Sequence, residues 1–266
     1  APQTTTMTLS QNLATMLKKI LEVVASISEM GIMRFGPEGM FLQTMDLSHV
    51  CLVEIKLPPD WFESYMCKDN TNLTTSFGTL VKMLGCIESG QRAWLRQGVQ
   101  EGTDSWELEL SGSNSVFTKR FRIPQYTLDD ELMQIPDSDA DTDFCMPSGN
   151  WSKIIDELSM FGEIVKVHCG EKGTTLSTRE QTEDVAMSCL IGLDDVESYE
   201  GCDEEFEVNF PIKMIQKVSA ARQAACLGPN GKITVHLTEE RPLDLNYDLG
   251  SNATARFIVA PRMDED

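Results

Sequence analysis

The sequence is poor in basic residues: it has 22 lysines and arginines against 42 aspartates and glutamates, for a net charge of −20. Because affinity for nucleic acid comes from phosphate neutralisation, this bulk charge by itself argues against a nucleic-acid partner. The sequence also lacks a run of about 18 apolar residues, so we expect no membrane partner. Its first residues have neither the basic nor the apolar region of a signal peptide, which predicts an intracellular protein.

Metal-binding and catalytic motifs are also missing. The eight cysteines include no Cys-x-x-Cys pair, and Cys51 and Cys169 lie in apolar alternation that is typical of reduced thiols packed in strands. We therefore expect no disulfide, no metal and no cofactor. Neither a Gly-x-x-x-x-Gly-Lys phosphate loop nor a Gly-x-Ser-x-Gly elbow occurs. Asp46, Ser48 and His49 are close in sequence, but a triad must converge in space, so we predict no enzyme activity.

What the sequence does contain is an internal repeat. A Lys-Ile-Leu-Glu segment at 19–22 precedes the turn at 36–39, and a Lys-Ile-Ile-Asp segment at 153–156 precedes the turn at 170–173. Both elements recur 134 residues apart, about half the chain, which predicts two copies of one domain and not a short-period solenoid. The expected bounds are 1–122 for the first domain, 123–138 for a linker containing two prolines, and 139–266 for the second domain.

Hydrophobic periodicity predicts two helices in each half, separated by strands. Ser10 is the expected N-cap of the first helix, and Pro211 is expected in the first turn of the last. The apolar stripes are Leu13, Met16, Leu17, Ile20, Leu21, Val24 and Ile27; Phe77, Leu80, Val81 and Leu84; Trp151, Ile154, Ile155 and Leu158; and Ile212, Ile215 and Val218. Strands are expected at 40–42, 50–55, 93–96, 106–110, 118–123, 164–169, 185–191, 206–210, 233–237, 243–248 and 255–260. The predicted fold class is α+β, with antiparallel sheets and two helices in each duplicated domain.

The helices carry lysines on the face opposite the apolar stripe, while acidic residues concentrate elsewhere. These lysines are Lys18, Lys19, Lys82, Lys153, Lys213 and Lys217. One interpretation is an ordinary solvated polar face, since Glu22 and Asp156 share it. The other is a modestly basic surface on an acidic body, which would meet phosphates loosely. No aromatic residues interleave with the lysines, so a single-strand stacking platform is not indicated.

Several segments resemble a known family. Met45-Asp46-Leu47-Ser48-His49-Val50-Cys51-Leu52 resembles the M-D-x-S-H-V-x-L segment of proliferating cell nuclear antigen, the eukaryotic DNA sliding clamp. The other matching segments, in chain order, are residues 17–22, 128–136, 146–149 and 260–263, the last of them before an acidic end. Together these collinear segments span nearly the whole chain.

The resemblance implies a homotrimeric ring of clamp domains, with sheets outside and helices lining a hole for duplex DNA. Such a clamp acts as a processivity factor for DNA polymerase and as a docking platform for replication and repair proteins, and an ATP-dependent clamp loader places it on DNA. It implies nuclear localisation. Two alternatives remain at this point: a processivity subunit that works as a monomer or in a mixed ring, and an acidic peptide-binding scaffold that does not encircle DNA.

The resemblance also assigns sites. The six helix lysines would line the DNA channel. The pocket for partner peptides would comprise Met45, His49, Val50, Leu52, Met133, Ile135, Pro136, Pro242, Ile258, Val259, Ala260 and Pro261. The subunit interface would pair Thr118, Lys119, Arg120 and Phe121 with Thr175, Leu176, Ser177, Thr178 and Arg179.

The sequence departs from the family pattern at functional positions. Ile258 stands where an aromatic residue is usual in the pocket, and Glu171 stands where the family has the lysine that accepts ubiquitin. Basic channel positions of the family are occupied here by Ala25, Gly85, Asp156 and Ala220. These changes fit a divergent eukaryotic member or one from a large DNA virus. In the second case the expected location is the viral replication compartment.

Overall fold

The computed structural model describes residues 5–100, 103–113, 117–181 and 184–263, so the acidic end beyond residue 263 lies outside it. The chain divides into two compact units, each built mainly from one half of the sequence. Unit 1 comprises residues 1–44, 53–133 and 249–255, and unit 2 comprises 45–52, 134–248 and 256–266. None of the helices in the described part has the length and apolarity needed to cross a bilayer.

The first half of the chain contains nine strands and two α-helices within its described residues. They are β1 (Thr6–Leu9), α1 (Gln11–Ile27), β2 (Met30–Gly36), β3 (Gly39–Met45), β4 (Cys51–Leu57), β5 (Ser64–Met66), β6 (Thr71–Ser76), α2 (Phe77–Leu84), β7 (Arg92–Gln100), β8 (Thr103–Ser111) and β9 (Lys119–Ile123). A short 3₁₀ turn at Pro59–Trp61 precedes β5.

The second half repeats this pattern. Its described elements are β10 (Thr142–Pro147), α3 (Ser148–Ser159), β11 (Gly162–Gly170), β12 (Gly173–Gln181), β13 (Ser188–Gly192), β14 (Ser198–Glu200), β15 (Phe206–Pro211), α4 (Ile212–Ser219), α5 (Arg222–Ala225), β16 (Lys232–Leu237), β17 (Leu243–Gly250) and β18 (Ala253–Val259). The short helix α5 was not predicted from the sequence.

The described strands form three sheets. A five-stranded sheet in unit 1 has the order β5-β1-β7-β8-β9, and a four-stranded sheet in unit 2 has the order β13-β12-β11-β15. The third sheet has the order β14-β10-β16-β17-β18-β4-β3-β2-β6. The neighbouring strands of the two smaller sheets, such as β8 with β9 and β12 with β13, pair antiparallel. This arrangement makes β9 and β13 edge strands.

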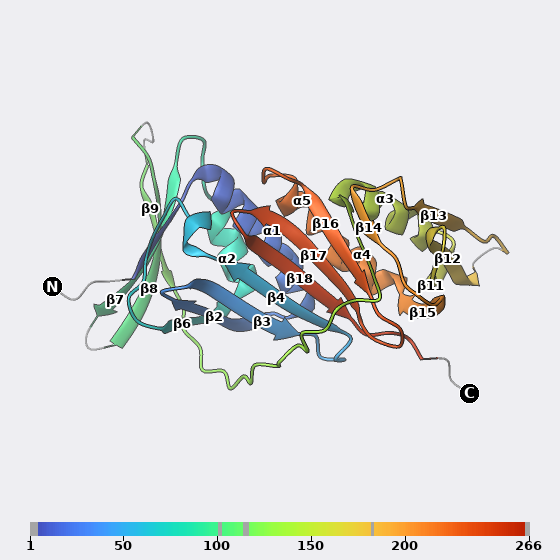
Figure 1. Ribbon diagram of the computed structural model, residues 1–266. Helices are drawn as coiled ribbons and strands as arrows, with labels where there is room; N and C mark the ends of the chain where they lie inside the picture. Colours follow the sequence, from blue (N-terminus) through green and yellow to red (C-terminus); the bar gives the residue numbers. More distant parts are fainter. Residues whose placement is uncertain (1–4, 101–102, 114–116, 182–183, 264–266) are drawn as a thin grey trace. The chain divides into compact units, whose positions relative to one another are not determined.

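Each unit places two helices side by side (Figure 1). Helix α1 contacts α2 and the strands β1 and β7, while α3 contacts α4 and the strands β10, β11 and β16. Of the predicted α1 stripe, all members except Leu13 are buried. The Leu13 amide donates to the Ser10 hydroxyl, which confirms the predicted N-cap. Pro211 was expected inside the first turn of α4, but it is the N-cap residue just before it.

The internal repeat is visible in the backbone of two hairpins. Gly36 pairs with Gly39 between β2 and β3, and Gly170 pairs with Gly173 between β11 and β12. Gly39 has φ 114° and Gly173 has φ 134°, a conformation that L side chains rarely adopt. A Cβ at either glycine would overlap a backbone oxygen, that of Leu57 in unit 1 and of Ile191 in unit 2. Because these clashing partners are themselves 134 residues apart, the two copies share a three-dimensional detail as well as a sequence pattern.

Candidate functional site

The predicted channel lysines of unit 1 lie on α1 and α2. Lys18 and Lys19 both approach Glu22, at 3.5 and 3.7 Å between nitrogen and carboxylate oxygen. These distances match the i,i+4 and i,i+3 spacing of one helix face. Lys82 is exposed on α2 and, among the described residues, has no ion-pair partner. The Lys18 stem reaches α2, because its Cε lies 3.4 Å from where a Cβ of Gly85 would stand.

The lysines of unit 2 lie on α3 and α4. Lys153, Lys213 and Lys217 are all exposed, and Lys213 has an ion pair with Glu163 at 3.8 Å. Between the helices, the side-chain amide of Gln216 donates from Nε2 to an Asp156 carboxylate oxygen at 3.1 Å. Each unit therefore brings its predicted lysines onto a pair of neighbouring helices.

A tight loop between β3 and β4 carries several predicted pocket residues. Asp46 organises it: one carboxylate oxygen accepts from the amides of Val50 and Cys51 at 2.7 and 2.8 Å. His49 takes φ 58°, and its amide donates to the Asp46 carbonyl. Asp46 therefore shapes this loop by capping two backbone amides, and Leu47 is left fully exposed at its tip.

The end of β18 lies beside this loop. The Ala260 amide donates to the Val50 carbonyl at 2.8 Å, so two predicted pocket segments far apart in sequence meet within unit 2. Burial separates the predicted pocket residues into three groups. Leu52 and Val259 are buried; Met45, Val50, Ile135, Ile258, Ala260 and Pro261 are half-buried; His49, Met133, Pro136 and Pro242 are exposed. Only the last two groups have surface that a partner could touch.

A buried glutamine that the sequence analysis missed holds the linker. In unit 1, Gln43 accepts from the Met133 amide at 2.7 Å and donates to the Met133 carbonyl at 2.9 Å. Its amide nitrogen also lies 3.3 Å from a carboxylate oxygen of Glu54, which is buried as well. Two hydrogen bonds to one backbone position fix where the linker runs. The available signal was a glutamine directly after the apolar run Met40-Phe41-Leu42 of this strand.

Strand β9 contains most of the first predicted interface segment and lies at the edge of its sheet. Lys119, Arg120 and Arg122 make it basic, and it pairs with β8 alone among the described strands. On β8, Glu109 accepts from Arg96 at 2.6 Å and lies 3.5 Å from Arg120. The hydrogen bond from Arg96 lowers the pKa of the Glu109 carboxyl below its ordinary 4.5. Glu109 therefore ties three strands together as an anion.

The second predicted interface segment, Thr175–Arg179, is not an edge. Strand β12 pairs with β11 along its length and with β13 over Gly173–Ser177, and the Thr178 amide donates to the Met187 carbonyl. Among the described strands, β13 is the edge of this sheet on that side, so this part of the expectation is corrected. The opposite edge, β15, is approached by the C-terminal segment, where the Arg262 amide donates to the Asn209 carbonyl.

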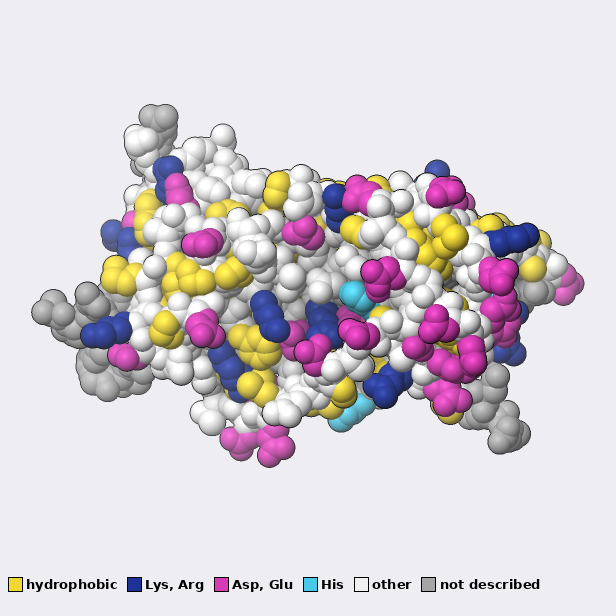
Figure 2. Space-filling model, in the orientation of Figure 1, with side chains coloured by type: hydrophobic (Ala, Val, Ile, Leu, Met, Phe, Trp, Pro, Cys, Tyr) yellow, Lys and Arg dark blue, Asp and Glu magenta, His cyan; other side chains and the backbone are white. Residues whose placement is uncertain are grey.

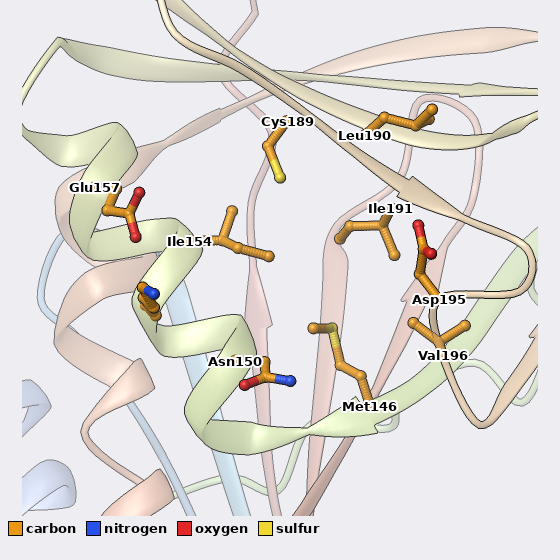
Figure 3. A pocket seen from close by; sticks show the side chains of 10 residues that line it. Met146, Asn150, Ile154, Glu157, Cys189, Leu190, Ile191, Asp195 and Val196 are labelled. Carbon is orange, nitrogen blue, oxygen red and sulfur yellow. The ribbon is translucent and has the colours of Figure 1, made fainter.

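A cavity of about 350 Å³ lies between α3 and the segment from β13 to β14. Figure 3 shows Met146, Ile154 and Ile191 pointing into it, with Glu157 and Asp195 around them. Cys189 lines it too, and burial raises the pKa of that thiol. The lining is apolar in its centre, and its charged side chains are Glu157, Asp195 and Lys153. Because the acids outnumber the single lysine, the cavity suits an apolar group better than a phosphate.

Acidic side chains gather elsewhere on unit 2. Figure 2 shows them over the part that holds strands β11 to β15, where Glu200, Asp203, Glu204, Glu205 and Glu207 are exposed. In the described part of the chain no group of three or more histidines, cysteines or acids is placed to hold a metal ion. All eight cysteines are free thiols, with Cys51, Cys67 and Cys169 buried.

A duplicated α+β chain with paired helices in each unit has the architecture of a clamp-fold protein. Two family models match it: "Proliferating cell nuclear antigen, N-terminal domain" at residues 7–137 and the C-terminal domain at residues 134–262. The chain is 26% identical over 260 residues to proliferating cell nuclear antigen 2 of Drosophila melanogaster, covering 97% of both chains. The chain belongs to the proliferating cell nuclear antigen family, which confirms the resemblance and the fold class drawn from the sequence. Members are non-enzymatic scaffolds, and membership supports a sliding-clamp role in DNA replication and repair.

Proposed function

We propose that three copies of this chain form a ring that encircles duplex DNA, without sequence preference, and tethers DNA polymerase to it. The observation that carries the proposal is the placement of lysines on the two helix pairs. Each pair carries three of the six lysines, in a chain whose net charge is −20. Few phosphate contacts bind weakly, and weak contacts are what a sliding protein needs when the ring itself prevents escape. The acids on the remaining surface would repel stray nucleic acid.

Ring closure is proposed to add β9 of one copy to β13 of the next, continuing one sheet across the interface. Both strands are five residues long. β9 is basic, while Asp184, Asp194 and Asp195 flank β13, so the charges are complementary. Strand β13 itself has no charged or proline residue to block pairing, and an unprotected edge of this kind invites a partner strand. The cavity beside Cys189 offers room for side chains from that partner.

Partner proteins are proposed to dock a short peptide on the surface formed by the Asp46 loop and the end of β18. Val50 and Ala260 are the core of this surface, because a hydrogen bond joins them. Half-buried apolar side chains such as Met45 and Ile258 would contact aromatic residues of the peptide. Because Ile258 replaces the usual aromatic, we expect a different ranking of partner peptides. The remaining pocket residues are proposed from the family resemblance.

Loading onto DNA is proposed to need an ATP-dependent clamp loader, because a closed ring cannot thread onto a chromosome. The proposed location is the nucleus, or the viral replication compartment if a large DNA virus encodes the chain. Regulation through ubiquitin at the usual position is not proposed, since Glu171 stands there.

The test is polymerase stimulation on a primed template with the loader present. Charge reversal of Lys82, Lys153 and Lys217 should abolish stimulation while binding of a labelled partner peptide stays intact. A control with reversal of Lys56, Lys68 and Lys172, exposed lysines outside the helices, should keep stimulation. Unchanged stimulation by the helix variant would contradict DNA encirclement and favour the acidic scaffold. The remaining alternative, a monomeric or mixed-ring subunit, is separated by the mass of the protein in solution.

A further inference from the structure

The six helix lysines are not electrostatically equal. Three have an acidic neighbour within ion-pair distance: Lys18, Lys19 and Lys213. For Lys82, Lys153 and Lys217, no ion pair occurs among the described residues. Equal proximity to DNA would therefore give unequal phosphate contacts, because a lysine already paired with a carboxylate must give up that partner first.

Glu22 is the acid with the largest effect, because one carboxylate serves two lysines. Each of its carboxylate oxygens forms one ion pair, Oε1 with Lys18 and Oε2 with Lys19. Lys18 and Lys19 together carry a charge of +2, and with Glu22 the net charge of the three side chains is +1. The three side chains are 31%, 32% and 38% exposed, so the pairs are partly hydrated and exchangeable. A phosphate can replace the carboxylate, but at a cost in affinity.

The corresponding acid in the second copy has a different partner. Asp156 occupies the position of Glu22 in the repeat, yet it accepts from Gln216 on the neighbouring helix and not from a lysine. Its neighbour Lys153, which corresponds to Lys19, stays exposed. Neutralisation of paired lysines by one carboxylate is thus a property of the first copy.

From this geometry we propose that Glu22 lowers the affinity of unit 1 for duplex DNA by forming ion pairs with Lys18 and Lys19. The proposal rests on the DNA-encircling function proposed above and assigns the setting of its affinity to one residue. Lys82 then makes the main phosphate contact of unit 1, and Lys153 and Lys217 make those of unit 2. Low affinity suits movement along DNA, because a clamp with fewer phosphate contacts has fewer to break each time it slides.

The direct test is binding of a short fluorescein-labelled linear duplex at low ionic strength, followed by anisotropy. Glu22→Gln should bind about threefold more tightly per subunit, the range expected when two exposed pairs are released. It should also steepen the dependence of affinity on salt, because more counterions are displaced. Glu38→Gln removes the same charge from an exposed turn of unit 1 and should leave the affinity nearly unchanged.

A double-mutant cycle separates pairing from simple repulsion. In a Lys18→Ala/Lys19→Ala background, Glu22→Gln should lose its gain, because no lysine remains to be released. If the gain persists there, or if Glu22→Gln binds like Glu38→Gln, the role of Glu22 is overturned while the clamp function stands. If neither the unmodified protein nor Glu22→Gln binds the duplex and Lys82→Glu changes nothing in polymerase stimulation, the proposed function itself fails.

Discussion

At the residue scale, the cysteines differ in the acidity of their thiols. Burial, with the nearby Asp46 carboxylate, raises the pKa of Cys51 to about 12, and burial raises that of Cys169 to about 11. Cys86 and Cys226 are exposed. Because the thiolate is the nucleophile, iodoacetamide at mildly alkaline pH should modify the exposed pair and spare the buried pair until urea is added. Peptide mass spectrometry checks this, and rapid labelling of native Cys51 would contradict the packing described.

The hydrogen bonds from Gln43 to the linker should contribute to the stability of the protein. Gln43→Ala removes both hydrogen bonds to the Met133 backbone and leaves Glu54 without its amide neighbour. We expect the free energy of unfolding to fall by about 1–3 kcal/mol, measured by urea denaturation. Gln223→Ala, at an exposed position, serves as the control and should change little. Equal stability of the two variants would mean that the linker is not held through Gln43.

At the scale of elements, the two hairpin glycines should be the least replaceable. Gly39→Ala and Gly173→Ala force a side chain into positive φ and against a backbone oxygen, and each should cost at least about 2 kcal/mol of stability. Gly149→Ala, near the start of α3 with open space around it, should be neutral or stabilising. Thermal unfolding compares the three, and similar melting temperatures would contradict the shared hairpin geometry.

Glu109 makes the attachment of β9 depend on pH. Because the folded-state pKa lies below the ordinary 4.5, the ionised carboxylate contributes stability above pH 4.5 that is lost as the pH falls through the lowered pKa. Glu109→Gln should therefore be less stable at neutral pH and lose less on acidification. Urea midpoints at neutral and acidic pH test this. Glu107→Gln, a more exposed acid on the same strand, should keep the acid dependence of the unmodified protein.

Elements with strong periodicity could be predicted from the sequence, and short polar ones could not. The stripe of α1 recurs over about four turns, so packing only reinforces it. By contrast, β6 reads Thr-Asn-Leu-Thr-Thr-Ser, and its strand state comes from pairing with β2. The same holds for β1, β5 and β14, which have three or four residues each. Such segments become strands only because neighbours complete their hydrogen bonds.

At the scale of the whole molecule, the residues of candidate sites could be predicted from the sequence, but not which of them contact one another. The spacing of Lys18 and Glu22 already suggests an ion pair, whereas the meeting of Val50 with Ala260 requires the fold. Likewise, no local sequence pattern predicts that β12 pairs with β13. That fact moves the proposed subunit contact from Thr175–Arg179 to Ser188–Gly192, because only a free edge can accept another strand.

Absolute mass from light scattering on a sizing column tests whether three copies of this chain assemble into the proposed ring. Across a dilution series, the protein should show about three times its chain mass of 29.7 kDa. Leu190→Lys puts a cation on β13, which is proposed to pair with basic β9 of the next copy, and should give a single chain. Asn246→Lys adds the same charge to β17, which is paired on both sides, and should stay trimeric. A single-chain mass for the unmodified protein at micromolar concentration would contradict the self-assembled ring.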